Sequence, residues 1–408
     1  MPDSKISALA ELTAVDPGDL LPIIDDPSGT PVTKKIQAKN LRQAFTNLTS
    51  HSTYVGYQSG QNEGNAYTDN TAYGYQALAG VLATPNPNTA AGAIRNTAFG
   101  YRALASLNSG YGNHAFGVQC LESLTTGIYN VAIGNFALKA CTEGGFNHAN
   151  GDRSLETLTT GSHNITIGYA TLQLLTTASD NVAIGGQAMV KCVTGQKNTA
   201  LGRQALSECL SDYNTAVGAN ALQSLTTANT CVAVGYLAGG SVTTGNNNTF
   251  VGWYAGQGVL TAQRNTCVGT MADISGTGGQ NTAIGYRAGA GLTSGASNTF
   301  IGDSSGDNVT SGSFNIIIGD GIDAASATGS NQINIGNALR GNASTHDAYI
   351  GKPSLATNAT FGFAYVPACD GTPTGTPTSV TGMVPIVVDS TNNKLYFYSG
   401  GAWRDAGP

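Results

Sequence analysis

One repeat dominates the sequence. A motif of the form Asn-Thr-Ala-[Val/Ile/Phe]-Gly returns at intervals of 16 or 17 residues, about sixteen times in the 408-residue chain. Its closing glycines are Gly100, Gly117, Gly134, Gly151, Gly168, Gly185, Gly202, Gly218, Gly235, Gly252, Gly269, Gly285, Gly302, Gly319 and Gly336. Gly56 and Gly74 begin the series, and an insertion at 79–95 separates them from the regular array. Such a register predicts stacked copies of one small unit rather than ordinary domains.

The residues before each glycine alternate in kind. The position just before it is apolar in nearly every repeat, with Asn150 as the exception, and the position three before it is Thr, Val or Ile, with His114 and His148 as exceptions. A small residue such as Ala132 stands between them. This period-two pattern predicts a short strand with one branched face and one small face. We expect the small face to let another backbone approach closely.

The rest of each repeat predicts a second short segment between turns. An Ala-Leu pair follows the glycine in the early repeats, for example at Leu104, and the Leu becomes Gly from Gly239 onward. A further apolar residue and a Thr-Thr-Gly turn complete the unit. We therefore predict an all-β fold, a parallel β-solenoid or β-roll of 17-residue rungs, forming a rod on the order of 80 Å long. Because a Leu column needs more interior space than a Gly column, we expect the rod diameter to change near Gly239.

An asparagine opens most of the motifs. Two readings of this column are a repeated ligand-binding or ice-binding face and a hydrogen-bonded ladder at a corner of the solenoid, and we favour the ladder. The residues predicted to form it are Asn113, Asn130, Asn164, Asn181, Asn198, Asn214, Asn265, Asn281 and Asn298.

Composition limits the partners. Only 10% of the residues are charged, and a net charge of −6 with a pI near 5.3 provides no basic face for nucleic acid or anionic lipid. No apolar run is long enough to cross a membrane. The first residues lack the features of a signal peptide, so we expect synthesis in the cytoplasm without export by that route.

The reactive side chains predict neither catalysis nor a metal site or cofactor. Six of the seven cysteines replace Leu, Ala or Asn in repeat columns, where each is expected to behave as a small hydrophobic residue. His114 and His148 lie two rungs apart, roughly 10 Å at strand spacing, which is too far to share one metal. The carboxylates of Glu122 and Glu156 share a column but are likewise two rungs apart, unlike the paired acids of a glycosidase. No nucleotide, zinc-protease or hydrolase motif occurs.

Both ends differ from the repeat, so the sequence divides into 1–50, the repeat shaft 51–352, and 353–408. In the first segment, 20–24 and 33–37 predict paired strands, and 39–48 predicts a helix with one apolar face. The last segment combines a Pro/Gly/Thr linker with a predicted hairpin of 384–388 and 394–398. Aromatic residues that are candidates to stack on receptor sugars, or else to pack the hairpin, are Tyr396, Tyr398 and Trp403.

Three parts of the chain resemble known families. The opening KISALAELTAVDPGDLLPIID with KKIQAKNLRQAF resembles the virion-attachment segment of phage tail fibres, and VPIVVDSTNNKLYFYSGGAWRDA resembles the terminal hairpin of phage fibre and spike proteins. The repeats, for example Asn281-Thr282-Ala283-Ile284-Gly285, resemble the head repeats of trimeric autotransporter adhesins, although the period of 17 is longer than in that family. These resemblances imply a parallel homotrimer on a virion. The small face and the need to cover strand edges point the same way.

The sequence thus predicts a non-enzymatic, virion-attached fibre. Its expected partners are further copies of itself, a virion tail or baseplate protein at the N-terminus, and a host-surface glycan or protein. The alternatives are a bacterial surface or ice-binding adhesin, a head fibre or decoration protein, and a polysaccharide-degrading tailspike.

Overall fold

The computed structural model describes residues 20–24, 33–37, 52–60, 69–80, 93–342, 347–350, 368–369, 386–389, 391, 394–399 and 401–405. Within these ranges the secondary structure is entirely β, with no helix. The helix predicted over 39–48 and the Pro/Gly/Thr linker lie outside the described residues. The all-β prediction is confirmed for the part of the chain that can be described.

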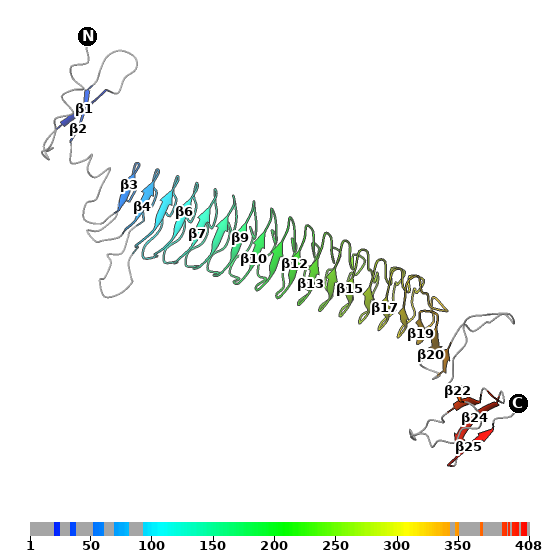
Figure 1. Cartoon of the computed structure of the whole chain (residues 1–408). Coiled ribbons are helices and arrows are strands. Elements are labelled where there is room, and N and C mark those ends of the chain that lie inside the picture. The colour runs from blue at the N-terminus through cyan, green and yellow to red at the C-terminus, as the bar shows by residue number, and fades with distance from the viewer. Residues whose placement is uncertain are drawn as a thin grey trace, which may run out of the picture.

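A parallel β-solenoid forms the middle of the chain, as predicted (Figure 1). Each rung contributes one short strand, and each strand pairs in parallel with the strand of the next rung, from β3 to β19. The parallel strands are β3 (Thr53–Val55), β4 (Thr71–Tyr73), β5 (Thr97–Phe99), β6 (His114–Phe116), β7 (Val131–Ile133), β8 (His148–Asn150), β9 (Ile165–Ile167), β10 (Val182–Ile184), β11 (Thr199–Leu201), β12 (Thr215–Val217), β13 (Val232–Val234), β14 (Thr249–Val251), β15 (Thr266–Val268), β16 (Thr282–Ile284), β17 (Thr299–Ile301), β18 (Ile316–Ile318) and β19 (Gln332–Ile335). Equivalent residues face each other in every pair, for example Ala183 and Ala200, so the register is that of the sequence repeat.

Antiparallel strands follow the parallel stack. The strand β20 (Leu339–Asn342) turns back on β19, and β21 (Asp347–Ile350) pairs with β20. Because β20 occupies the free edge of β19, the last parallel rung is covered by the chain itself.

Two further sheets were partly predicted. The strands β1 (Leu20–Ile24) and β2 (Thr33–Gln37) pair antiparallel, at the two segments where the sequence predicts strands. At the other end, β23 (Ile386–Asp389) and β24 (Lys394–Ser399) form the expected hairpin. Two strands were not predicted: β22 (Ala368–Cys369), which is parallel to β23, and β25 (Ala402–Asp405), which is antiparallel to β24.

The small face of each strand points into the solenoid. In β7 the central Ala132 is fully buried, whereas Val131 and Ile133 on either side are half-buried and exposed. The buried alanine packs in a core that includes the Ala, Leu and Cys columns of the opposite segment, such as Ala137, Leu138 and Cys141. The expectation that the small alanine face would admit a second chain is therefore wrong. In rungs that carry a Leu in the opposite column, the interior is narrow enough to require a small residue there.

The motif glycine is fixed by its backbone and by the next rung. Gly134 has a φ of +126°, a region that side chains rarely adopt, and a Cβ atom on it would lie 2.5 Å from the carbonyl carbon of Gly151. The close backbone approach inferred from the sequence thus exists, but it joins neighbouring rungs of one chain.

The corners also depend on positive φ at residues with side chains. In one rung these are Tyr129 (φ 54°), Phe136 (φ 62°) and Leu138 (φ 51°), and equivalent positions in other rungs repeat them. Each such residue costs on the order of 1 kcal/mol. The regular hydrogen bonds between rungs offset that cost, for example from the Leu138 N–H to the Ser154 carbonyl at 3.0 Å.

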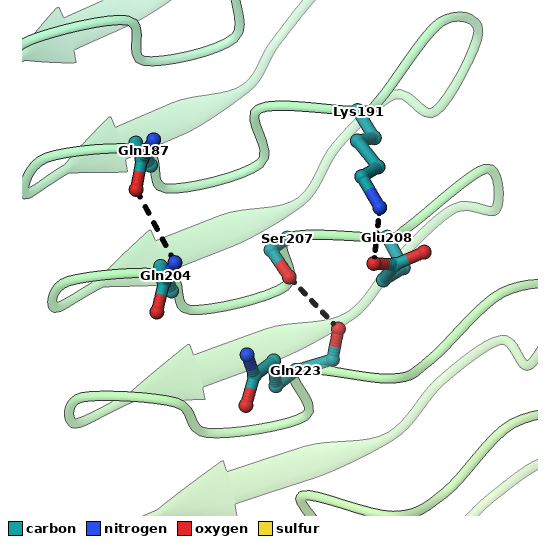
Figure 2. A network of polar contacts seen from close by, with 6 residues as sticks. All are labelled: Gln187, Lys191, Gln204, Ser207, Glu208 and Gln223. Carbon is teal, nitrogen blue, oxygen red and sulfur yellow. Dashed lines mark hydrogen bonds and ion pairs between the residues drawn. The ribbon is translucent and has the colours of Figure 1, made fainter.

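Polar side chains on the flank behind the strands also join successive rungs. Figure 2 shows Gln204 donating to Gln187 and Ser207 donating to the carbonyl of Gln223. Lys191 and Glu208 form an ion pair of 2.6 Å on the same flank. An exposed ion pair of this kind contributes at most about 1 kcal/mol to stability, so this flank adds little to the free energy of unfolding.

Candidate functional surfaces

The asparagine column is a buried ladder that only Cys231 interrupts between Asn96 and Asn315. The backbone N–H and the side-chain Nδ2 of Asn130 both donate to Oδ1 of Asn113, at 3.0 and 3.1 Å. The same Nδ2 donates to the carbonyl of Gly144 at 2.7 Å. Each asparagine thus bonds to the rung before it and the rung after it.

The predicted ladder residues all occupy this buried column. At most 1% of each residue is exposed, so no surface ligand or ice lattice can contact them; they are Asn113, Asn130, Asn164, Asn181, Asn198, Asn214, Asn265, Asn281 and Asn298. Two positions depart from the pattern. Nδ2 of Asn265 has no partner, and Cys231 replaces Asn, so that its Sγ donates to the carbonyl of Gly245. The left-handed φ at this corner belongs to the residue before the asparagine, as at Phe146 before Asn147.

The Thr-Thr turns are also structural. The hydroxyl of Thr125 donates to the carbonyl of Thr142 in the next rung at 2.9 Å, and Thr159 donates to Thr176 in the same way. A hydroxyl that is already bonded to the backbone is a poor ligand for an ordered water lattice. An ice-binding surface built from these threonine hydroxyls is therefore disfavoured.

The cysteines and carboxylates considered in the sequence have local partners. Each of the six cysteines in the solenoid is buried, and burial raises the pKa of the Cys120 and Cys192 thiols to about 12. Glu122 pairs with Arg102 at 2.9 Å, and Glu156 accepts from Gln173 at 2.8 Å. Across the described ranges, no group of three or more His, Cys, Asp or Glu side chains is arranged to hold a metal ion. No helix of that part of the chain is long and apolar enough to span a membrane.

The outward face of the parallel sheet is an extended surface that the solenoid itself does not cover. The two outer residues of each strand from β3 to β19 are half-buried or exposed, and none is Asp, Glu, Lys or Arg. Large apolar residues recur along it; those most exposed are Tyr73, Phe99, Phe116, Ile133, Ile165, Ile167, Ile184, Val232, Val234, Val251, Ile284 and Ile316. This row of exposed apolar residues is interrupted at β8, where His148 and Asn150 are polar, but its extent along the rod is of the kind that marks an interaction surface.

Aromatic residues concentrate at the N-terminal end of this face. The rings of Tyr73, Phe99 and Phe116 stack in successive rungs at 5.9 and 5.4 Å. Tyr75 and Tyr101 stack beside them at 5.5 Å. Because the rings cover one another's faces, they present edges rather than open faces for a sugar.

The C-terminal sheet places the three predicted receptor residues differently. Tyr396 is only 7% exposed and so presents little of its ring to a ligand. Tyr398 and Trp403 face each other across β24 and β25, with ring centroids 5.3 Å apart in an edge-to-face arrangement. These two half-buried rings serve at least to pack the sheet.

Comparison with known proteins assigns no family. No protein-family model matches the chain, and no curated protein or solved structure matches it. The class of protein is therefore defined by the fold alone: a parallel β-solenoid repeat protein.

Proposed function

We propose that this chain is a non-enzymatic structural subunit of a virion fibre, assembled as a parallel homotrimer through the outward face of its solenoid. The uncharged face that runs from β3 to β19, formed mainly by Val, Ile, Phe and Thr, supports this more than any other observation. Interfaces of obligate oligomers are large and resemble a divided hydrophobic core. Each of the three rods would then keep its own hydrophobic core, and the branched residues of the outward face would form the contacts between the rods.

A copy of the same chain fits this face because the face is regular. Every rung presents the same two positions, one strand spacing apart, so parallel copies in register place like residues opposite each other along the whole length. A cyclic trimer closes on itself and leaves no unpaired apolar face. The resemblance of the two ends to phage fibre segments supports attachment to a virion at one end and binding to a host surface at the other. There, three weak binding sites, one from each chain, would act together.

The test is the solution mass of the full chain by light scattering. A trimer gives about 124 kDa, three times the 41.4 kDa of the chain. The double variant Ile167→Glu/Val234→Glu places charges on the outward face and should shift the mass towards that of the monomer. The matched control is Leu174→Glu/Leu210→Glu, which changes two leucines that are also exposed (43% and 46%) but lie outside the strands, and it should remain trimeric.

A wild-type mass near 41.4 kDa at all concentrations would contradict the assembly. The host-binding role needs a separate measurement, in which labelled full-length protein is mixed with cells from a panel of bacterial species. Adsorption of the trimer is expected, and a trimer that binds no cell-surface component would limit the chain to a scaffold such as a head fibre.

A further inference from the structure

One irregular rung opens a notch in the side of the rod. The interval from Asn265 to Asn281 is 16 residues, whereas the rungs on both sides have 17. A cavity of about 250 Å³ lies where this shorter rung turns away from β15. Its walls come from three successive rungs and are formed by Tyr254, Gln257, Met271, Asp273, Arg287 and Ala290.

Asp273 holds the inner wall of the notch in place. It stands in the column that is Leu or Gly in the neighbouring rungs, and its Oδ1 accepts the N–H groups of Gly258 and Ile274 at 3.0 and 2.9 Å. Its Oδ2 accepts the hydroxyl of Ser275 at 2.5 Å. In a regular rung the N–H equivalent to that of Gly258 bonds to a backbone carbonyl, as Ser123 does to Lys139. The carboxylate therefore replaces that carbonyl and fixes the shape of the notch.

Arg287 supplies an uncommitted positive charge at the rim. It is exposed, and its guanidinium makes no ion pair or side-chain hydrogen bond with another described residue. Arg102, at the equivalent position of an earlier rung, pairs with Glu122 at 2.9 Å. Asp273 already accepts three hydrogen bonds. The guanidinium of Arg287 is therefore the charged group of the notch with the most hydrogen-bond donors left for a ligand.

An aromatic wall faces the same space. Tyr254 lines the notch and is braced by Trp253 and Tyr236, with ring centroids 4.2 and 5.6 Å away. A ring held in this way, next to an amide (Gln257) and a guanidinium, combines an apolar surface with planar hydrogen-bonding groups. That combination suits the apolar face and the hydroxyls of a sugar.

We propose that this notch is a binding subsite for a hexuronic acid unit of an acidic glycan. The guanidinium of Arg287 pairs with the sugar carboxylate through two parallel hydrogen bonds. Gln257 and the Tyr254 hydroxyl bond to ring hydroxyls. A volume of about 250 Å³ lies below the roughly 300–1,000 Å³ of pockets for drug-sized ligands, which favours one sugar unit over an oligosaccharide. The inference rests on the proposed function only for the source of the glycan, the host surface.

Titration of the full chain with glucuronate, followed by ligand-observed NMR, tests the site, and glucose serves as the uncharged match. We expect saturable binding of glucuronate with a Kd on the order of 1 mM, and binding of glucose at least tenfold weaker. Arg287→Gln should weaken glucuronate binding at least tenfold. Arg102→Gln, in the same column of a regular rung, should leave it unchanged.

Three results would overturn the proposal: no saturable binding of glucuronate, equal binding of glucose, or equal binding by Arg287→Gln. Circular dichroism of each variant checks that the solenoid is intact, since Arg287 is exposed but Arg102 is half-buried beside Glu122. Since the titration does not depend on mass or on cell adsorption, failure of the subsite is distinguishable from failure of the fibre proposal.

Discussion

The ring of Phe250 fills the space that a side chain on Gly256 would need, so a Cβ atom on that glycine would overlap the ring. On the other side of the ring, a Cβ atom on Gly239 would come within 2.6 Å of it. The change from Leu to Gly at the fourth residue after the motif glycine is thus matched by a change from Ala to Phe at the central position of a neighbouring strand. The same exchange recurs where Phe300 packs against Gly289 and Gly306.

This exchange predicts compensation between the two columns. Phe250→Ala should lower the free energy of unfolding by about 3–5 kcal/mol, because it leaves a cavity between two glycines. Adding Gly239→Leu and Gly256→Leu should recover most of the loss, since Leu104 and Leu138 adopt the same positive φ in earlier rungs. Chemical denaturation measures all three proteins. A triple variant less stable than Phe250→Ala would contradict the exchange.

Two adjacent glycines should respond in opposite ways to the same substitution. Gly185 has a φ of +121°, and a Cβ atom on it would lie 2.6 Å from the carbonyl carbon of Gly202, whereas one on Gly186 would have nothing within 4 Å. Gly185→Ala should therefore destabilise the protein by at least about 2 kcal/mol. Gly186→Ala should be neutral or stabilise it by up to about 1 kcal/mol. Thermal melting of the two variants gives the comparison, and similar midpoints would refute it.

Removing one ladder residue should cost more than removing an exposed asparagine. Asn147→Ala deletes the two hydrogen bonds that its Nδ2 donates, to Asn130 and Gly161, and removes the acceptor of the buried backbone N–H of Asn164, which donates to Oδ1 of Asn147 at 3.0 Å. We expect a loss of roughly 3 kcal/mol or more, since each unsatisfied buried group costs about 1–3 kcal/mol. The control Asn135→Ala removes an exposed acceptor of the Val118 N–H and should cost less than about 1 kcal/mol. Equal losses in urea denaturation would argue against the ladder as a source of stability.

Asp273 should make stability depend on pH. Burial raises the pKa of its carboxyl in the folded chain, against the opposing hydrogen bonds from Ser275, Gly258 and Ile274. The folded state therefore binds the proton more tightly than the unfolded state. This contribution is fully present below the ordinary pKa of 3.8 and is lost as pH rises through the raised value.

Asp273→Asn removes that titration while keeping an oxygen for the two backbone N–H groups. The variant should gain stability relative to the wild type as pH increases from 3 to 7, as measured by denaturation at each pH. A constant difference across that range would show that the carboxyl does not titrate between the folded and unfolded states.

The spacing of the motif determined most of the fold. It predicted the strands, their parallel order and the register, because a repeat of constant length can bury its apolar positions only by stacking. The inward direction of Ala132 was not predicted, because alternation shows that two faces differ without showing which is enclosed. The interior width decides this, and it depends on the Leu column of the same rung.

The strand β25 was missed because Ala402–Asp405 has little apolar alternation. The available signal was the pair of glycines between β24 and β25 in the sequence, a pattern typical of tight hairpins. The notch was missed for another reason: a rung shorter by one residue looks like ordinary drift in a repeat. Only the hydrogen bonds of Asp273 show that this rung differs in geometry.

At Cys231 the ladder is interrupted, because this residue has no amide oxygen to accept the N–H of Asn248. The change from Leu to Gly at Gly239 occurs within the same rung. A rod pulled along its axis loads its rung junctions in series, so the junction with the fewest bonds yields first. We therefore expect tension along the rod to separate β13 from β14 more readily than it separates rungs joined by an intact ladder, such as β6 and β7. The rod would thus have a defined junction that opens at a lower force than its regular junctions.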